Sequence, residues 1–249
     1  MMKLEIWHLQ NLNQNLLMIK SEAVHCTALM KGEKFLHNKI SYEIYSEAGT
    51  YHKQHGIENQ DAIKVGMKDD YFFCAISDGC GSSKYAKQAA EVVVEASIDF
   101  CYGFVNKSEK IESFKELPYI LQLELQNKSQ ILNLDFCELK STLVLFVLNI
   151  KTKRYCIAHI GDGIVICGDQ VLSYPENGFI KRFTYFANQK DVLKHFRVNT
   201  GILKNQCALI STDGLFFNCY NTNDYIRRSK EICLTKQDDD VTYCRLQID

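Results

Sequence analysis

The chain has 249 residues, of which 46% are hydrophobic and 24% charged, a composition typical of a folded globular protein that excludes a disordered chain. Its 29 Lys and Arg residues nearly balance its 30 Asp and Glu residues, so no net field favours nucleic acid or an acidic membrane as a partner. The 11 cysteines are scattered without a CxxC pair or zinc-type spacing, and we interpret them as reduced core cysteines.

Residues 1–38 precede the first clear strand pattern, and we predict that they form an N-terminal extension to one domain at 39–249. Residues 1–20 contain several Asn and Gln residues and lack the continuous apolar core of a signal peptide. No run reaches the roughly 18 apolar residues of a membrane helix. We therefore expect a cytoplasmic protein without a membrane partner.

The first half of the domain alternates between predicted strands and helices. Strands are expected at 41–45 and at 71–76, the second of which is a short apolar and aromatic run typical of a buried strand. Ser82 or Ser83 is expected to cap a helix that runs to about Phe100. A second helix is predicted over 113–132, with Pro118 near its start or breaking it.

The second half is predicted to consist mainly of strands. Residues 141–150 and 154–160 form an apolar pair that indicates a hairpin, and 164–167 and 171–174 flank a tight-turn signal at Gly168-Asp169. Late strands are expected at 207–210 and 241–246. Strands joined by short turns, with two long helices inserted, predict an α+β fold of antiparallel sheets with helices packed outside, and not a doubly wound parallel sheet.

Acidic residues recur at the predicted strand ends. Three apolar strands each end in an Asp-Gly pair, a run of three aspartates directly precedes the last strand, and one more aspartate follows the first strand. Each motif alone is explained more simply as a turn, a solvated loop or a helix cap. The motifs are Ser77-Asp78-Gly79, Gly161-Asp162-Gly163, Thr212-Asp213-Gly214, Asp238-Asp239-Asp240 and Asn59-Gln60-Asp61.

Taken together, these motifs predict a metal centre. Strand ends at one rim of a sheet can converge, and the carboxylates gathered there would repel one another unless cations neutralise them. Mg²⁺ and Mn²⁺ prefer carboxylate, carbonyl and water oxygens, and a glycine after a ligand lets the backbone approach the ion. Two such ions about 3.5–4 Å apart can share a hydroxide and aim it at phosphorus for in-line displacement.

In this order the motifs resemble the metal-dependent Ser/Thr protein phosphatases of type 2C (the PPM family), in a compact bacterial branch. The resemblance extends over about residues 41–248. The matching stretches are Gly49-Thr-Tyr-His52, Gly56-Ile-Glu-Asn-Gln-Asp-Ala62, Ala75-Ile-Ser-Asp-Gly-Cys-Gly-Ser-Ser83, Ser141-Thr-Leu-Val144, His159-Ile-Gly-Asp-Gly163, Leu209-Ile-Ser-Thr-Asp-Gly-Leu215 and Asp239-Asp-Val-Thr242.

The resemblance implies a four-layer α/β/β/α sandwich and a centre of two divalent cations, Mg²⁺ or Mn²⁺, with a possible third. By the family's pattern, Asp78 would bridge both metals and the carbonyl of Gly79 would bind the second. Asp213 and Asp239 would complete the first metal. Asp61 would lie beside the second metal, through a water molecule, as a catalytic residue.

The chain departs from the family's pattern in three places. Gln60 stands where many members have Glu, and a neutral amide is a weaker ligand for a hard cation. The eukaryotic members hold the substrate phosphate with an Arg, whereas this chain has His52, for which we predict phosphate contact or proton transfer; a polar surface residue is the alternative. Cys80 replaces a His of the eukaryotic members, and without a phosphate-cradling loop and Arg it is not expected to act as a nucleophile.

Three further features are implied with less detail. A third metal would use an acid just before the Ser-Thr strand, for which Asp135 and Glu138 are candidates. Asp162 is expected to order the rim through hydrogen bonds and not to bind metal directly. Residues 170–204 correspond to a flap-like insertion whose aromatic and basic residues could contact a phosphopeptide, although an ordinary capping subdomain would look the same.

The predicted function is metal-dependent hydrolysis of phosphoserine and phosphothreonine on proteins. The expected partners are phosphorylated protein substrates and a cognate Ser/Thr kinase, and neither the net charge nor any base-stacking motif favours nucleic acid. Two alternatives stay open at this point. One is a catalytically inactive relative that binds phosphoproteins or partners as an adaptor, which Gln60 and the missing Arg favour, and the other is an enzyme that acts on small phosphoesters.

Overall fold

The computed structural model describes residues 33–37, 39–107, 110–176, 184–216, 218–232 and 237–249. Its strands are β1 (Glu33–His37), β2 (Ile40–Glu47), β3 (Ala62–Lys68), β4 (Tyr71–Ser77), β5 (Leu143–Asn149), β6 (Arg154–Ile160), β7 (Ile164–Cys167), β8 (Gln170–Ser173), β9 (Arg197–Ile202), β10 (Cys207–Ser211) and β11 (Val241–Ile248). Its α-helices are α2 (Thr50–His55), α3 (Ala86–Asn106), α4 (Leu117–Leu132), α5 (Val192–His195) and α6 (Thr222–Lys230), and its 3₁₀ helices are η1 (Ile111–Glu116), η2 (Phe136–Glu138) and η3 (Asp213–Phe216).

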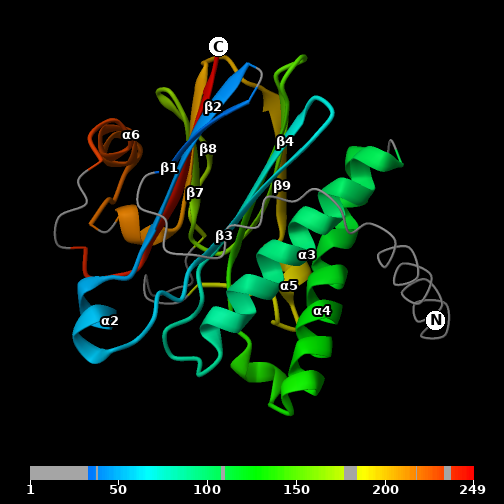
Figure 1. The fold of residues 1–249 in the computed structure, drawn as a ribbon, viewed down its shortest axis with the longest axis vertical. Helices are drawn as coiled ribbons and strands as arrows, with labels where there is room; N and C mark the ends of the chain where they lie inside the picture. Colours follow the sequence, from blue (N-terminus) through cyan, green and yellow to red (C-terminus); the bar gives the residue numbers. More distant parts are fainter. Residues whose placement is uncertain (1–32, 38, 108–109, 177–183, 217, 233–236) are drawn as a thin grey trace.

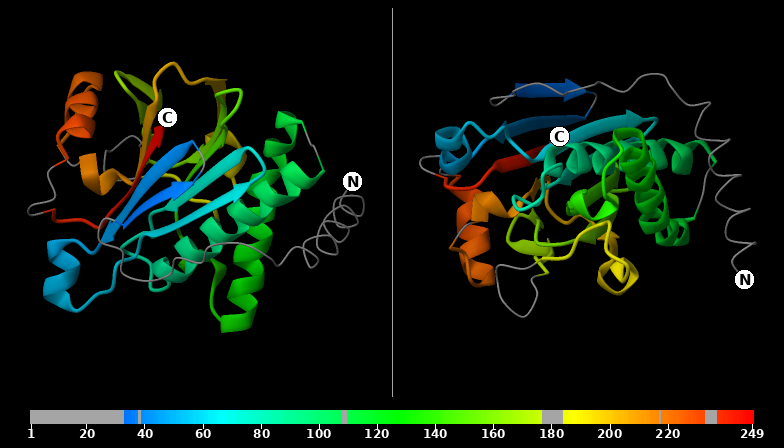
Figure 2. Two further views of the ribbon diagram at one scale, coloured as in Figure 1. Left: turned by 45° about the horizontal axis from the view of Figure 1, so that its top comes forward. Right: turned by 90° about the horizontal axis from the view of Figure 1, so that it is seen from below.

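The strands form two antiparallel sheets. One has the strand order β1-β2-β11-β10-β7-β8, and the other has the order β3-β4-β5-β6-β9. Helices α3 and α4 lie together against the outer face of the second sheet, and α6 lies on the opposite side of the molecule (Figure 1). Figure 2 shows the same layers from two further directions. The predicted α+β fold of two antiparallel sheets with flanking helices is confirmed.

Strand β4 explains how the layers are held together, because both of its faces are buried. Phe72 and Ile76 point into the core between the two sheets, whereas Phe73 and Ala75 point toward α3 and α4. This alternation follows from the period of two along a strand, and burial on both sides explains why the sequence here is continuously apolar. Phe146 on β5 is also fully buried between the sheets.

The outer face of the first sheet has a much smaller helical cover. Leu215 and Phe216 of η3, with Tyr225 and Ile226 of α6, pack against residues of β7, β10 and β11. Helix α6 has only 9 residues, compared with 21 in α3, so this fourth layer is short. Among the described residues, no helix is both long enough and apolar enough to span a bilayer.

Both predicted long helices are present, and both begin later than predicted. Helix α4 begins at Leu117 with Pro118 in its first turn, after the 3₁₀ helix η1, so Pro118 starts this helix and does not break it. Helix α3 begins later than expected, at Ala86, and Tyr85 precedes it without a side-chain cap. The expected cap at Ser83 is wrong, because its hydroxyl donates instead to the backbone carbonyl of Glu138.

Several strands were not recognised in the sequence. Strand β1 lies inside the predicted extension at 1–38, and β9 lies inside the predicted flap-like insertion at 170–204. The rest of that extension and the middle of the insertion, residues 177–183, lie outside the described residues. Both expected hairpins are present, as β5–β6 and as β7–β8 around Gly168, whose φ of 57° is the left-handed conformation that favours glycine.

Candidate metal centre

The antiparallel pairing brings the acidic motifs to one rim of the molecule. Strand β4 ends where β3 begins, since Ser77 pairs with Ala62, and β6 ends where β5 begins, since Ile160 pairs with Leu143. In the other sheet, Ser211 at the end of β10 pairs with Tyr243 near the start of β11. The residues that follow β4, β6 and β10 and those that precede β3 and β11 therefore share one edge, as predicted from the sequence.

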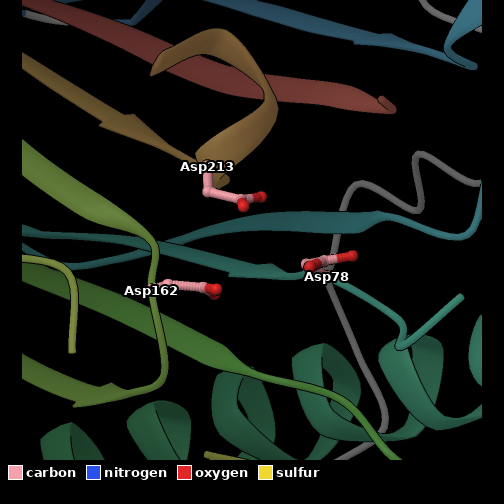
Figure 3. Close-up of side chains that lie close together, drawn as sticks. All are labelled: Asp78, Asp162 and Asp213. Carbon is pink, nitrogen blue, oxygen red and sulfur yellow. The ribbon is translucent and has the colours of Figure 1, made fainter. Parts of the chain in front are cut away.

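Three aspartates form the centre of this rim. Asp78 follows β4, Asp162 follows β6 and Asp213 follows β10, and one carboxylate oxygen from each lies within 4.8 Å of the others. Figure 3 shows the three side chains pointing into one space from three separate segments of the chain. All three are partly buried. Among the described residues, no basic side chain forms an ion pair with any of them.

The electrostatics of the three carboxylates reflect their crowding. Burial raises the pKa of Asp78 well above its ordinary value, and the nearby charges of Asp61, Asp213 and Asp162 raise it further. The pKa of Asp213 is also raised well above its ordinary value, first by burial and then by Asp162 and Asp239. Burial raises the pKa of Asp162 to about 6. Each negative charge here is costly unless a cation lies beside it.

Asp61 lies at the start of β3 and is 1% exposed. Its Oδ2 accepts a hydrogen bond from the hydroxyl of Thr212 at 2.9 Å, while its Oδ1 is buried without a partner in the described part of the chain. Burial raises the pKa of Asp61 to about 7, with a further contribution from Asp240. The Nζ of Lys87 donates to the backbone carbonyl of Asp61 at 2.7 Å, and therefore leaves the carboxylate uncompensated.

Asp239 borders the same cluster. It contributes to the raised pKa of Asp61, Asp78, Asp162 and Asp213, which places its charge near all four carboxylates. Its own pKa is raised by burial, although its carboxylate also accepts the backbone N–H of the next residue at 2.9 Å. Asp239 thus lies at the rim, as its position just before the last strand predicted.

Its neighbour Asp240 plays a different part. This carboxylate is 3% exposed and accepts three hydrogen bonds from the segment that joins β2 to β3. Its Oδ1 lies 2.8 Å from the backbone nitrogen of Gly49 and 2.8 Å from Nδ1 of His52. Its Oδ2 accepts the backbone N–H of Gln60 at 2.6 Å. Nothing in the sequence distinguished this aspartate from its neighbours as the one that organises the loop.

Close packing explains the glycines that follow two of the aspartates. A Cβ on Gly79 would lie 2.6 Å from the backbone oxygen of Ala86 and 2.7 Å from that of Gln60. A Cβ on Gly214 would lie 1.9 Å from the backbone oxygen of Asp240. Any side chain at either position would push neighbouring backbone apart, so glycine is required for the rim to close.

Four further residues that the sequence singled out can now be placed. Asp162, expected to order the rim through hydrogen bonds and not to bind metal directly, lies in the three-aspartate cluster. A hydrogen bond with the Thr184 side chain acts against the rise in its pKa, and its Oδ1 has no partner among the described residues. Asp135 caps η2 by accepting from the backbone of Cys137, and Glu138 accepts from the backbone of Lys84. The Sγ of Cys80 lies 3.2 Å from a serine hydroxyl.

The residues present fit divalent cations. The donors are carboxylate oxygens, which are the ligands that Mg²⁺ and Mn²⁺ prefer. Buried oxygens of Asp61 and Asp162 and the amide oxygen of Gln60 have no hydrogen-bond partner in the described structure. Buried polar atoms without partners are rare in folded proteins, and bound ions or water would satisfy these.

Comparison with known proteins gives a consistent result. The sequence model of the protein phosphatase 2C family matches residues 48–244. The solved structure of RsbX in complex with magnesium superposes with a TM-score of 0.58 at 17% identity, covering 88% of this chain and 100% of the other. The Ser/Thr phosphatase Stp1 from Staphylococcus aureus superposes with a TM-score of 0.60 at 14% identity, covering 92% and 100%. No curated protein matches the chain.

Proposed function

Because this chain belongs to the protein phosphatase 2C family, we propose that it hydrolyses phosphoserine and phosphothreonine on proteins by means of a water molecule activated by two divalent cations. The observation that carries the proposal is the convergence of Asp78, Asp162 and Asp213 within 4.8 Å, with raised pKa values that bound cations would lower. Mg²⁺ and Mn²⁺ both suit this set of oxygen donors.

We assign the cations to residues as follows. Asp78 would bridge the two ions, Asp213 and Asp239 would complete the first, and the carbonyl of Gly79 would bind the second, with Asp61 beside it through water. Bound there, the cations would supply an activated water and neutralise charge on the phosphoryl group. The hydrogen bond from Thr212 to Oδ2 of Asp61 and the unpaired, buried Oδ1 support this role, because they hold the carboxylate in place and leave one oxygen available to accept from a water molecule.

His52 is the residue that we propose for the substrate. Its side chain is 12% exposed and lies close enough to Asp239 to offset part of the rise that burial causes in the pKa of that carboxyl. From this place a His ring can contact a phosphate oxygen or carry a proton to the departing serine or threonine oxygen. Eukaryotic members have a His at the position of Cys80. Because that His is missing here, His52 would take over the proton transfer.

The proposal also covers the substrates, the opposing enzyme and the extent of the domain. The substrates would be phosphorylated proteins in the cytoplasm, opposed by a cognate Ser/Thr kinase, and residues 39–249 would constitute the phosphatase domain. Within it, residues 170–204 would serve as the flap beside the site. Its described part includes Arg197, whose guanidinium pairs with Glu176 at 3.0 Å and donates to the carbonyl of Tyr174 at 2.8 Å, which would anchor the base of the flap.

A phosphothreonine peptide tests the proposal directly. The wild-type chain should release phosphate with Mn²⁺ and not with a chelator, and Asp78→Asn should lower kcat by about a hundredfold or more, as the loss of a metal-bridging charge does. Asp169→Asn is the matched control, because Asp169 is also next to a glycine in a turn but is exposed, pairs with Lys230 and lies in the turn between β7 and β8, at the other end of β7 from Asp162. A folded wild type that binds phosphoproteins without turnover would replace this proposal with the adaptor.

A further inference from the structure

We propose that Asp240 is a positioning residue that fixes the ring of His52, with Nδ1 as the protonated nitrogen and Nε2 as the nitrogen directed to the substrate. The inference rests on the proposed function, since it concerns the residue that we assign to the phosphoester. It goes further because it gives a role to an aspartate that lies next to the proposed ligand Asp239 but is not itself assigned to a cation.

The geometry of Asp240 carries this inference. Its Oδ1 lies 2.8 Å from His52 Nδ1, across a sequence separation of 188 residues. The same carboxylate accepts the backbone N–H groups of Gly49 and Gln60, at 2.8 and 2.6 Å, which lie at the two ends of the segment that contains His52. One buried side chain therefore holds both ends of this segment and the ring between them.

The hydrogen bonds also determine the tautomer. A backbone N–H can only donate, and each oxygen of the Asp240 carboxylate accepts one, from Gly49 and from Gln60. With both oxygens acting as acceptors, the hydrogen in the contact with His52 is assigned to Nδ1. In a neutral ring Nε2 is then the acceptor nitrogen, and in a charged ring it is a donor. Either state leaves Nε2 facing away from Asp240, because the two nitrogens point in different directions.

The helix that contains His52 adds a reason why such support is needed. Helix α2 has 6 residues, and none of them is buried. A helix this short is not stable by itself, so its position depends on contacts with the rest of the molecule. Apart from its ring contact with Asp240, the described attachments of α2 include Thr50 N–H and Thr50 Oγ1, which donate to the carbonyl of Gln237 and to Asp238 Oδ1.

Asp238 provides a matched control for the effect of loosening helix α2. It belongs to the same acidic run and contacts the same short helix, through Thr50 Oγ1 at 2.9 Å and through its carbonyl to the backbone of Tyr51 at 3.3 Å. Its carboxylate does not contact the His52 ring in the described structure. A loss that arises merely from loosening the helix should therefore appear in Asp238→Ala as well as in Asp240→Ala.

The first experiment is a double-mutant cycle on phosphothreonine-peptide hydrolysis. We expect Asp240→Ala to lower kcat/KM by about tenfold or more, a typical effect of losing a residue that orients a catalytic group, and Asp238→Ala to change it by less than about twofold. If Asp240 acts through His52, adding Asp240→Ala to His52→Ala should lower activity no further. A double variant at least tenfold weaker than His52→Ala would show that Asp240 acts by another route and would overturn the proposal.

The conservative variant Asp240→Asn distinguishes the contact with His52 from the contact with Gln60. The amide oxygen of Asp240→Asn can still accept from Gly49 and from His52, whereas its NH₂ group cannot accept from Gln60. Asp240→Asn should therefore recover most of the activity that Asp240→Ala loses. If Asn and Ala behave alike, the contact with Gln60 matters and the contact with His52 does not, which contradicts the proposal.

The second experiment does not depend on activity. Long-range ¹H–¹⁵N correlation spectra of the Mg²⁺-loaded protein, at a pH where the His52 ring is neutral, should report the Nδ1–H tautomer in wild type and in Asp240→Asn. They should report a shift toward Nε2–H in Asp240→Ala, with the signal assigned by its loss in His52→Ala. An unchanged tautomer in Asp240→Ala would overturn the inference. If the wild type proves inactive, the proposed function fails, and these spectra still decide the role of Asp240.

Discussion

At the scale of one residue, the buried carboxyl of Asp61 shows how the acidic rim destabilises the fold when no cation is bound. It is buried at the start of β3, its pKa is raised to about 7 by burial and by Asp240, and one of its oxygens has no described partner. Between its ordinary pKa of about 4 and its pKa in the fold, the native state holds a proton that the unfolded chain has released. Stability must then decrease as the pH rises through that window.

The first prediction follows from this decrease in stability with rising pH. With a chelator present, the melting temperature should be lower at pH 8 than at pH 5.5, by about 5 °C, because Asp61 and Asp162 ionise in that range against their neighbours. Differential scanning calorimetry at several pH values measures it. Asp61→Asn keeps an oxygen for Thr212 but cannot ionise, so its profile should be flatter. A wild-type melting temperature that rises from pH 5.5 to 8 would contradict the prediction.

The second prediction concerns Asp162. Because its carboxylate lies in the cluster with Asp78 and Asp213, Asp162→Asn should weaken Mn²⁺ binding by about tenfold or more. Isothermal titration calorimetry measures the affinity, and Asp169→Asn, which changes an exposed aspartate in another turn, should leave it unchanged. If Asp162→Asn binds Mn²⁺ as wild type does, the role expected from the sequence, hydrogen bonding alone, is the right one.

At the scale of the element, the sequence predicts best those strands that are buried on both faces. Strand β4 is a continuous apolar run because one face meets the other sheet and the other face meets α3. Strand β9 escaped recognition because it is an edge strand, with the sequence Arg-Val-Asn-Thr-Gly-Ile and no fully buried residue. Strand β3 contains Lys64 and Gly66, which interrupt the apolar pattern, although Lys64 is 7% exposed.

The third prediction concerns the turn that follows β4. The backbone N–H of Asp78 donates to Thr142 Oγ1 at 3.0 Å, and the backbone N–H of Thr142 donates to the carbonyl of Asp78 at 2.9 Å, which joins the end of β4 to the start of β5. Thr142→Val keeps the shape but leaves the Asp78 N–H without an acceptor, at a cost of about 1–3 kcal/mol in the free energy of unfolding. Urea unfolding measures it. The exposed Thr200→Val on β9 should change stability by less than about 0.5 kcal/mol, and equal effects in the two variants would refute the role given to this hydrogen bond.

At the scale of the whole molecule, the centre is shared between the two sheets. Asp78 and Asp162 follow strands of one sheet, while Asp213 and Asp239 adjoin strands of the other. The strand-end positions of these aspartates could be predicted, because each motif adjoins an apolar strand. The contacts between them could not, because Thr212 meets Asp61 across 151 residues and Asp240 meets His52 across 188. Only the packing of one sheet on the other determines which of several aspartates face inward.

The fourth prediction uses the fact that both sheets contribute ligands to determine how many cations bind. A site built from both sheets exists only in the folded chain, so each bound ion should stabilise the fold by about 1.4 kcal/mol for every tenfold rise in free Mn²⁺ above its dissociation constant. Two ions give about 2.7 kcal/mol per decade and three about 4.1. Urea unfolding at a series of Mn²⁺ concentrations measures this slope. Asp78→Asn should reduce it, because the proposed bridging ligand serves both ions, whereas Asp169→Asn should not. A wild-type slope near zero would mean that the fold closes around its crowded carboxylates without any cation, and the proposed chemistry would lose its basis.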